Sequence, residues 1–492
     1  MAPEAGSAAD WKDGVIALLK AARWDDAIAA LRQRLADQPR EAQAWVFLGE
    51  ALEHQGKRWA AWRCYDRGWM LDPQAAWAPA AEARLKGSLE EAGPDWLDSL
   101  LAVPKVRVVG AVLARDEAEN IDRCVRALLP AVDELWVIDT GSQDDTPAIA
   151  KQAGARVLEV PWEDDFGKAR RAADEVLGND GWVLWVDADE FLRPEDVQVP
   201  RIVAGLYSGL DVPMLLRIVQ VNHLGNVVDP NYDTTRMFPL GKGFSWRGRI
   251  HEQVAAIEGP TAALRGAVRI RVDHWGYERS VMERRQKFDR NIRLLRAWTE
   301  DEPENAAAWG FLGRDLFIAG QLEEAVKVLY QAESLGQRDR NYARLPEVRA
   351  VLCEALVRLR RLEEARVVAE RLTRETPDFP TGWYWKGHVA LLQANDAVQS
   401  AIDASRRVRQ LAPRYRGLVS VNPEIVQFLA PVAEADALKM AGQWEAALQL
   451  YEAALQAKPN HLGVLQQIRG IKERARKIAQ ATGDASRQRE TH

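Results

Sequence analysis

Cysteine is scarce in this chain, and its scarcity limits the folds that can be expected. The 492 residues include only three cysteines, Cys64, Cys124 and Cys353, which lie far apart and form no CxxC pair. We therefore expect neither a disulfide scaffold nor a structural zinc site. A run of about 18 apolar residues and a basic leader followed by an apolar stretch are also missing, so we expect no membrane span and no secretion.

An excess of positive charge is absent as well. The sequence has 66 basic and 72 acidic residues, with a formal net charge of −6. A chain without a large positive field is not expected to be a general nucleic-acid binder. The length predicts about three domains, and we expect a cytoplasmic protein.

Tryptophan, in contrast, is abundant, with 19 residues against ten phenylalanines and nine tyrosines. Part of this excess follows a period of 34 residues, since Trp11 and Pro39 recur as Trp45 and Pro73. An aromatic residue that opens one helix, a small alanine in the next and a proline that ends it describe a helix pair. The pattern is that of the tetratricopeptide repeat, and it predicts a helical segment over 1–100.

The same pattern returns in a second helical segment, predicted over 291–470 and followed by a polar tail over 471–492. One of its units leaves the register open. Trp383 keeps the 34-residue step, whereas Trp385 is in register with Ala401 and Pro413. The stretch 414–424 breaks the period and is predicted to be an insertion loop.

Two repeats seldom form a stable solenoid alone, because each needs a neighbour to cover its apolar face. The N-terminal pair is therefore expected to dock on the middle of the chain. Candidate residues for the contact are Trp77, Trp96, Leu97 and Leu100.

The middle segment, 101–290, alternates between apolar runs and helical patterns. Strands are expected over 106–113, 134–138, 156–160 and 182–186, with a helix around 167–177. Such alternation with short links predicts an α/β domain with a mainly parallel open sheet. Ligands bind such sheets beyond the carboxyl ends of the strands.

Acidic residues gather at those predicted strand ends. Asp116 and Glu117 follow the first strand, Asp139 ends the second, and Asp187 and Asp189 end the 182–186 strand. An acidic edge repels phosphates unless a divalent cation lies between, so it indicates a metal-bridged diphosphate. The Gly-rich phosphate loops GxGxxG and GxxxxGK[ST] are absent. The D-A-D triplet alone is a weak signal, since it could also be a helix N-cap.

Six stretches, in order, resemble a family 2 glycosyltransferase of the GT-A fold. They are ARDEAENIDRCV (114–125), ELWVIDTGSQDDT (134–146), VPWEDDFGKARRAA (160–173), WVDADEFL (185–192), FSWRGRIHEQ (244–253) and DHWGYERS (273–280). The last two resemble a bacterial subgroup with a tetratricopeptide array. That subgroup includes peptide and protein glycosyltransferases related to the glycocin S-glycosyltransferases.

This resemblance implies roles for individual residues at the strand ends. Glu117, Asp139 and Asp144 would bind the nucleoside part of the donor, Asp187 would lie near the ribose, and Arg170 would add charge near the phosphates. Asp189 would ligate Mn²⁺ or Mg²⁺, with His274 as a further ligand. Two positions depart from the family pattern, because Asp116 replaces its usual Asn and Arg171 its usual Asn.

The inverting mechanism implied by the family needs one general base to deprotonate the acceptor. Glu252 is the first candidate and the neighbouring His251 the second. Asp229 and Asp233 stay open as alternatives. We assign His223 to loop structure.

The resemblance implies a hexosyl- or N-acetylhexosaminyltransferase that uses a nucleotide-sugar, with a UDP-sugar as the expected donor. Tetratricopeptide arrays suit extended peptides, so the expected acceptor is a Ser, Thr or Cys side chain of a peptide or protein. Three alternatives remain open. They are a lipid-linked or lipopolysaccharide core sugar as acceptor, a scaffold without activity, and an array used for homodimerisation.

Six tryptophans fall in the middle segment and divide into two groups. Trp136, Trp182 and Trp185 belong to expected strands and are predicted to be core. Trp162, Trp246 and Trp275 belong to expected loops beside the motifs, where an aromatic face could stack on a sugar or cover a nucleotide.

Overall fold

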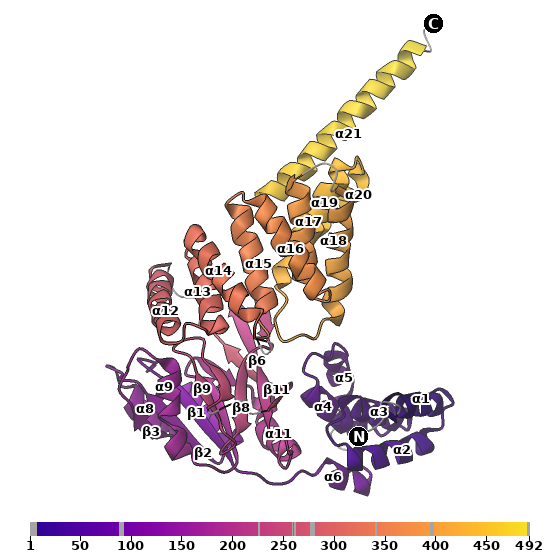
Figure 1. Cartoon of the computed structure of the whole chain (residues 1–492). Helices are drawn as coiled ribbons and strands as arrows, with labels where there is room; N and C mark the ends of the chain where they lie inside the picture. Colours follow the sequence, from indigo (N-terminus) through magenta and orange to yellow (C-terminus); the bar gives the residue numbers. More distant parts are fainter. Residues whose placement is uncertain are drawn as a thin grey trace. The chain divides into compact units, whose positions relative to one another are not determined.

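A computed structural model describes residues 7–87, 93–224, 227–257, 259, 262–275, 281–339, 342–393 and 398–489 of the chain. The chain divides into two compact units, Met1–Ser280 and Val281–His492, and each is described by itself (Figure 1). Residues 276–280 of the DHWGYERS motif lie outside the described residues.

Unit 1 is built around a large mixed sheet. Its strand order is β3-β2-β1-β4-β8-β6-β11-β5, with β7 paired to β6, and β9 and β10 form a second small sheet. The strands are β1 Val108–Ala114, β2 Glu134–Asp139, β3 Arg156–Glu159, β4 Trp182–Asp187, β5 Glu190–Leu192, β6 Met214–Leu224, β7 Val227–Asn231, β8 Thr235–Pro239, β9 Phe244–Arg247, β10 Gln253–Ala256 and β11 Leu264–His274.

The first four strands confirm the parallel α/β pattern expected from the sequence. β1 lies in the middle and pairs in parallel with β2 on one side and β4 on the other. The remainder of the sheet is largely antiparallel, because β8 runs against both β4 and β6. The parallel half therefore carries the strand ends at which a ligand site is expected.

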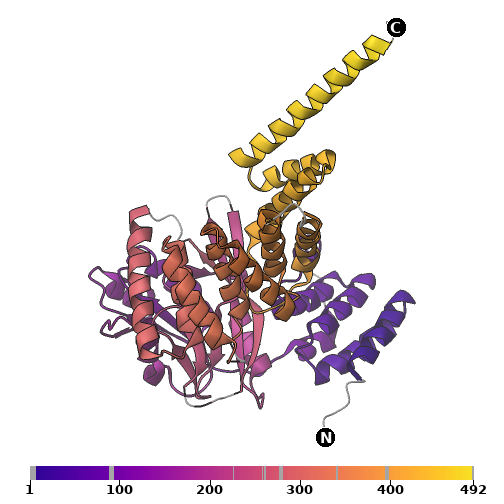
Figure 2. The ribbon, with the colours of Figure 1, turned by 45° about the horizontal axis from the view of Figure 1, so that its top comes forward.

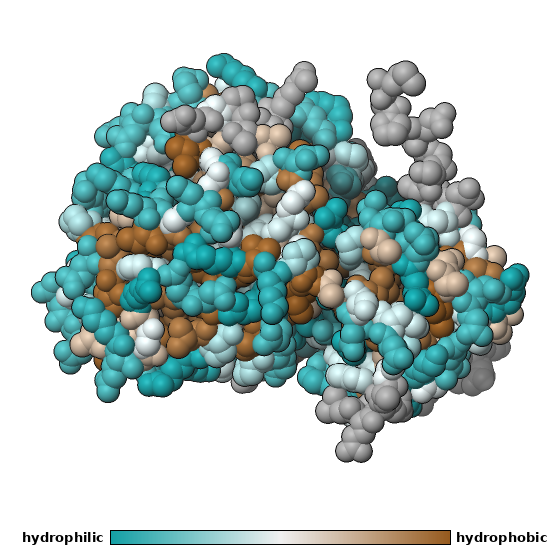
Figure 3. Space-filling view, turned by 90° about the horizontal axis from the view of Figure 1, so that it is seen from below, coloured by the Kyte–Doolittle hydropathy of each residue, from teal (hydrophilic) through white to brown (hydrophobic). Residues whose placement is uncertain are grey.

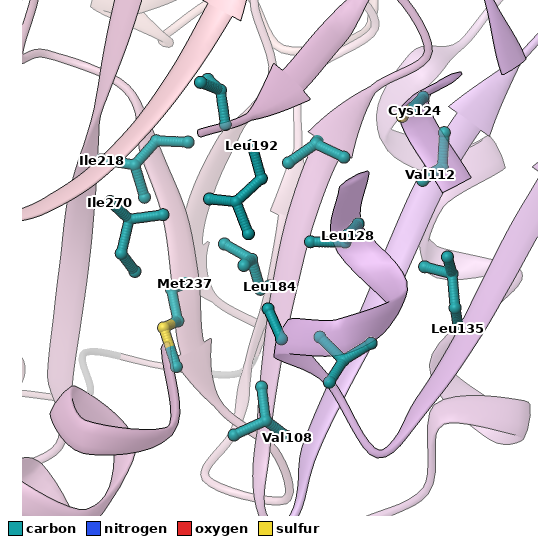
Figure 4. Packing of buried hydrophobic residues seen from close by; sticks show 14 of the residues in the cluster. Val108, Val112, Cys124, Leu128, Leu135, Leu184, Leu192, Ile218, Met237 and Ile270 are labelled. Atoms are coloured by element: carbon teal, nitrogen blue, oxygen red, sulfur yellow. The ribbon is translucent and has the colours of Figure 1, made fainter. Parts of the chain in front are cut away.

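Helices cover both faces of this sheet. They are α7 Ile121–Leu128, α8 Thr146–Ala153, α9 Phe166–Arg171, α10 Asp174–Leu177 and α11 Val199–Tyr207. On one face, Cys124 and Leu128 of α7 pack with Leu184 and Ile270 of the sheet (Figure 4). The other face buries a separate cluster around Trp185.

The helix expected around 167–177 is wrong as a single element, because it is split into α9 and α10. The chain tightens between them, where the N–H of Ala173 donates to the carbonyl of Arg170, only three residues back. This tight turn interrupts the regular i to i−4 hydrogen bonding of an α-helix.

The N-terminal part of unit 1 consists of helix pairs, as the 34-residue period predicted. The helices are α1 Ser7–Lys20, α2 Trp24–Asp37, α3 Ala42–His54, α4 Arg58–Leu71, α5 Ala78–Leu85 and α6 Asp95–Leu101. The four residues proposed for docking on the middle segment, Trp77, Trp96, Leu97 and Leu100, pack within this helical cluster.

Helix α4 makes the contact with the sheet. Met70 joins the core of the sheet, and the ring of Trp69 lies 4.3 Å from the guanidinium carbon of Arg269 on β11. Arg269 also donates to Asp66 at 2.6 Å and to the fully buried Asp196 at 3.2 Å. Asp196 accepts further hydrogen bonds from Arg271. The contact between the N-terminal helices and the sheet is thus a network of ion pairs beside one tryptophan. The residues expected at this contact were wrong, because an apolar pattern does not show whether a side chain packs among the helices or against the sheet.

Unit 2 is a row of antiparallel helices, as predicted for tetratricopeptide repeats (Figures 1 and 2). The helices are α12 Val281–Asp301, α13 Ala306–Ile318, α14 Leu322–Gly336, α15 Leu345–Arg358, α16 Leu362–Glu375, α17 Pro380–Gln393, α18 Val398–Leu411, α19 Ala430–Met440, α20 Trp444–Ala457 and α21 Leu462–Arg489. Residues 415–422 contain no helix or strand, which confirms the insertion loop.

The repeats share one hydrogen bond between consecutive units. The indole N–H of Trp45 donates to the carbonyl of Pro39 at 2.8 Å. Trp309 and Trp383 repeat this bond at the same distance, with the prolines six residues before them. The bond fixes Trp383, rather than Trp385, as the repeat position.

The surface of the molecule mixes polar and apolar residues. Both kinds reach the face shown in Figure 3. Large apolar side chains exposed in unit 1 include those of Val227 and Val228 on β7. Across the described parts of the chain, every helix is too short or too polar to cross a bilayer.

Candidate active site

Two aspartates mark the carboxyl edge of the parallel strands. The register pairs Ala114 of β1 with Asp139 of β2, and Leu113 of β1 with Asp187 of β4. Asp139 and Asp187 therefore end the strands on either side of β1 at nearly the same height. The sequence predicted this convergence, and the structure confirms it.

The loops after β1 and β2 are bound to each other around Asp139. The Asp139 carboxylate accepts from the N–H groups of Gly141 and Ser142, each at 3.1 Å, and from the Ser142 hydroxyl. Asp116 has a φ of +54° and accepts from the N–H of Gln143 at 2.6 Å. These bonds give Asp139 a fixed orientation beside the strand ends.

Glu117 and Asp144 belong to the same pair of loops. The N–H of Glu117 donates to the hydroxyl of Thr146 at 2.8 Å. One oxygen of Asp144 accepts from the N–H of Ala118 at 3.1 Å, and the other accepts from Thr146. The Thr146 hydroxyl lowers the pKa of Asp144. Asp144 therefore ties the two loops together as an ionised carboxylate.

Asp187 is held by two arginines. One oxygen accepts from Arg170 at 2.6 Å and from Arg236 at 3.2 Å, and the other accepts from Arg236 at 2.5 Å. Burial alone would raise the pKa of Asp187, but the two guanidiniums hold it well below its usual range. Asp187 is thus a permanently charged carboxylate at the site.

Arg170 also brings Glu252 into the site. Its Nε donates to Oε1 of Glu252 at 2.8 Å, although the two residues are 82 positions apart. The Arg170 side chain is only 2% exposed and lies over the rings of Trp185 and Trp246. The RIHEQ stretch is therefore anchored beside the D-A-D stretch, as the choice of Glu252 required.

Asp189, in the turn between β4 and β5, faces His274 at the end of β11. Nε2 of His274 lies 3.4 Å from Oδ2 of Asp189, and Nδ1 of the ring lies 2.9 Å from Oδ1 of Asn222. The amide oxygen of Asn222 can only accept, so it assigns a proton to Nδ1 and directs Nε2 at the carboxylate. Burial opposes protonation, but the Asp189 carboxylate raises the pKa of His274. The two facing acceptors need a cation between them, either a proton or a metal ion.

The donor set fits a divalent ion, since imidazole nitrogen and carboxylate oxygen both bind Mn²⁺. Among the residues that the structure describes, no three His, Cys, Asp or Glu side chains are grouped to hold a metal. Of the described residues, Asp189 and His274 would therefore be the ligands of such an ion, together with oxygen atoms of a substrate.

Three residues of the site were missed by sequence reasoning, namely Arg236, Glu190 and Asn222. Glu190 accepts from the N–H of Asp187 at 2.8 Å and from Gln220. Burial raises the pKa of Glu190 to about 7, against the effect of Arg236. Asn222 and Arg236 lie on strands that carry other polar residues as well, so no local signal in the sequence singles them out.

The other candidates for the base lie in different places. His251 precedes Glu252 and has a φ of +52°, an uncommon value for a residue with a side chain. Asp229 lies on β7, and Asp233 follows that strand, where its N–H donates to Asn231. Arg170, in contrast, donates to the carboxylates of Asp187 and Glu252. The structure thus couples Glu252 directly to the strand ends.

Two expectations about neighbouring aromatic residues were wrong. Trp246 is a buried residue of β9, with its ring against the edges of Trp185 and Phe238. His223 lies on β6, where its Nε2 lies 2.8 Å from Asp273 and its ring stacks on Trp275 at 4.0 Å. His223 finds its polar partner within the sheet, on β11, whereas Trp246 belongs to β9 because its ring packs among other aromatic rings.

The remaining tryptophans agree better with expectation. Trp182 and Trp185 are buried strand residues, and Trp136 is partly buried on β2. Trp162 lies in a loop, where its N–H donates to Asp164 at 3.0 Å. Trp275 directly follows β11 and is 51% exposed.

Comparisons with known proteins agree with this architecture. Residues 111–221 match the family model described as Glycosyl transferase family 2, and 13–61 and 283–341 match a model of the tetratricopeptide repeat. A TPR repeat-containing protein of Synechococcus elongatus is 32% identical over 246 residues, which are 48% of this chain and 59% of that protein. This chain therefore spans about three-fifths of that relative's length.

Two further relatives are named as glycosyltransferases. The SPbeta prophage-derived glycosyltransferase SunS of Bacillus subtilis is 23% identical over 291 residues, 59% of this chain and 68% of SunS. An uncharacterized glycosyltransferase of Rickettsia felis is 38% identical over 89 residues, 18% of this chain and 31% of that protein.

Proposed function

Because this chain carries a family 2 glycosyltransferase domain and tetratricopeptide repeats, we propose that it transfers a sugar from a nucleotide-sugar to a peptide or protein. The acceptor atom is a hydroxyl or thiol of Ser, Thr or Cys. The observation that carries the proposal is the pair formed by Asp189 and His274 at the carboxyl edge of the sheet, with Nε2 and Oδ2 3.4 Å apart.

Asp189 and His274 are the residues that would hold Mn²⁺ or Mg²⁺. Ions of this kind are commonly bound by one or two protein groups together with the phosphates of a substrate. Asn222 supports the assignment, because its hydrogen bond to Nδ1 keeps Nε2 as the ligating atom. When bound, the ion supplies Lewis-acid stabilisation of the charge that develops on the departing diphosphate.

The nucleoside part of the donor, a UDP-sugar in this proposal, binds at the loops that follow β1 and β2. Glu117 and Asp139 contact the nucleoside, with Asp139 accepting from an N–H of the base. Asp187 lies near the ribose, and Asp144 keeps the two loops together. Arg170 adds positive charge between Asp187 and Glu252. That charge offsets the carboxylates that would otherwise repel a diphosphate.

Glu252 acts as the general base, with His251 as the second candidate. A Glu252 oxygen accepts the proton of the acceptor hydroxyl or thiol while the acceptor atom attacks the anomeric carbon. The bond from that carbon to the diphosphate oxygen breaks, its electron pair leaves with the nucleoside diphosphate, and the configuration is inverted. Only one base is needed, since the leaving group departs as an anion.

The repeats are proposed to bind the acceptor. Tetratricopeptide arrays offer extended surfaces suited to peptides, and unit 2 provides such an array. This arrangement favours a peptide or protein acceptor over a lipid-linked or lipopolysaccharide core sugar.

Turnover of nucleotide-sugars tests the proposal. The full chain is incubated with Mn²⁺ and a panel of UDP- and GDP-sugars, and release of the nucleoside diphosphate is measured with and without Ser-, Thr- and Cys-containing peptides. We expect slow hydrolysis of one donor, and a peptide mass increase of one sugar where the acceptor matches. If the wild-type chain turns over no donor and donor addition causes no thermal shift, the proposed enzymatic activity is refuted. Transfer only to core-type glycans would refute the peptide acceptor.

A further inference from the structure

We propose that Arg236 is a positioning residue that holds Glu252 in place through Asp187 and Arg170. Arg236 and Arg170 both bind the Asp187 carboxylate, and Arg170 also binds Glu252, so the four side chains form a chain of contacts in which positive and negative charges alternate. Because Glu252 is the base only in the proposed function, this inference rests on that function. It goes beyond it by assigning a task to a residue on β8, outside all six sequence motifs.

Arg236 binds Asp187 through both of its terminal nitrogens. The Nη1 and Nη2 atoms donate to separate Asp187 oxygens at 3.2 and 2.5 Å. The side chain is only 8% exposed, and the pairing of Leu184 with Met237 places Arg236 beside Trp185 of β4. A two-pronged contact of this kind fixes the plane of the carboxylate, which a single point charge would not do.

The orientation of Asp187 is passed on to Arg170. Asp187 Oδ1 accepts from one nitrogen of Arg170 at 2.6 Å, and another nitrogen of the same guanidinium holds Glu252 at 2.8 Å. The guanidinium carbon of Arg170 is 4.6 Å from the ring of Trp246 and 5.0 Å from that of Trp185. A planar, rigid group that lies over both rings transmits a tilt at one edge to the other.

The charges give the second reason. Arg236 and Arg170 carry two positive charges, which balance the negative charges of Asp187 and Glu252. Without Arg236, both carboxylates would depend on Arg170 alone, and Asp187 would draw the guanidinium away from Glu252. Glu190, whose carboxylate is 3.8 Å from Arg236, would also lose this ion pair and keep its hydrogen bonds from Asp187 and Gln220. Glu252 would then lose the contact that fixes its distance from the strand ends.

A simpler view is that Arg236 only stabilises the sheet. The two views differ in whether the effect of Arg236 on turnover depends on Glu252. Substitutions at two sites that act through one group are not additive, whereas effects of independent sites multiply.

A double-substitution cycle on the full chain makes this distinction. With the most active donor and Mn²⁺, kcat and the donor KM are measured for wild type, Arg236→Met, Glu252→Gln and the double variant. Displacement of a catalytic group by about 1 Å can cost about 100-fold, so we expect Arg236→Met to lower kcat by about 10- to 100-fold. If Arg236 acts through Glu252, the same substitution in the Glu252→Gln background should change kcat by less than about twofold. A full multiplicative loss in the double variant would overturn the inference.

Two further variants show whether a lower kcat comes from a general loss of folding. Arg236→Lys keeps the charge but not the two-pronged contact, and we expect its kcat to lie between wild type and Arg236→Met. Arg269→Met is the matched control, because Arg269 is 3% exposed, paired with two carboxylates and part of the same sheet. It should lower thermal stability and leave kcat unchanged. Equal kcat losses in Arg269→Met and Arg236→Met would overturn the inference.

A crystal structure of the Arg236→Met or Arg236→Lys variant tests the network without turnover. We expect Glu252 to leave its 2.8 Å contact with Arg170. If Glu252 keeps that contact, the inference fails even in an active enzyme. If the wild type turns over no donor, the proposed function fails, and the displacement of Glu252 still decides whether Arg236 positions it.

Discussion

Nε2 of His274, at the end of β11, and Oδ2 of Asp189, in the turn between β4 and β5, are 3.4 Å apart. The opposite nitrogen of the ring is bound to Asn222. The ring therefore cannot turn its N–H toward Asp189 without losing that partner. A neutral His274 would thus present a lone pair to the Asp189 carboxylate, which is the arrangement that the proposed metal site requires.

Asn222→Ala should weaken the metal site without removing a ligand. The substitution frees Nδ1 and lets the ring of His274 rotate, and loss of such a supporting partner typically costs 10- to 100-fold in metal affinity. We expect donor turnover to need about 10- to 100-fold more Mn²⁺, and Asp189→Asn to lose metal-dependent turnover altogether. The measurement is the initial rate against Mn²⁺ concentration. An Mn²⁺ dependence equal to that of wild type in both variants would contradict the assignment.

Glu252→Gln should separate chemistry from donor binding. The amide oxygen can still accept from Arg170, but the side chain can no longer take a proton. Loss of a general base costs about 100- to 10,000-fold, so kcat for transfer should fall by about that factor while the donor KM stays within about threefold. Steady-state kinetics check this. A larger loss in His251→Asn than in Glu252→Gln would assign the base to His251.

Asp196→Asn should destabilise unit 1 strongly. Asp196 is 0% exposed and accepts from both Arg269 and Arg271 beneath the N-terminal repeats. Removal of one charge from a buried ion pair costs about 3–5 kcal/mol. Asp66→Asn removes the more exposed partner of Arg269 and should cost at most about 1 kcal/mol. Urea unfolding followed by circular dichroism compares the two, and equal losses would mean that the buried pairs contribute little.

Trp45→Phe should cost more stability than Trp309→Phe. Both substitutions remove the indole N–H that donates to a proline carbonyl at 2.8 Å. The bond of Trp45 is partly buried, so its carbonyl loses a partner that water replaces poorly, at a cost of about 1–3 kcal/mol. The bond of Trp309 is exposed, and we expect about 1 kcal/mol or less. Thermal unfolding measures the difference, and an inverse order would argue against the bond as a stabilising contact.

The acidic edge of the site was predictable because it depends on local sequence. Asp139 and Asp187 each end an apolar run, and the carboxyl ends of parallel strands meet at one edge. Glu252 needed the resemblance to a known family, since a lone carboxylate in a loop has no signature of its own. Its contact with Arg170, 82 residues away, depends on tertiary packing.

Arg236 and Asn222 could not be predicted in the same way. Each is one of several polar residues in its strand, and its partner is 49 or 52 positions distant. The antiparallel half of the sheet could not be predicted either, because the order of the strands after β4 depends on pairing between residues that are distant in the sequence. The contact of α4 was missed because Trp69 pairs with arginines rather than with an apolar patch.

The indole-to-proline bond has a consequence for how such an array changes in length. The donor is a tryptophan near the start of α3, α13 and α17, and the proline six residues before it supplies the acceptor, whereas α15 and α19 contain no tryptophan. A cut of the array between such a proline and its tryptophan therefore separates the donor from the acceptor, whereas a cut elsewhere keeps the two together. Gain or loss of helix pairs outside these short segments can thus change the length of an array and leave its hydrogen bonds in place.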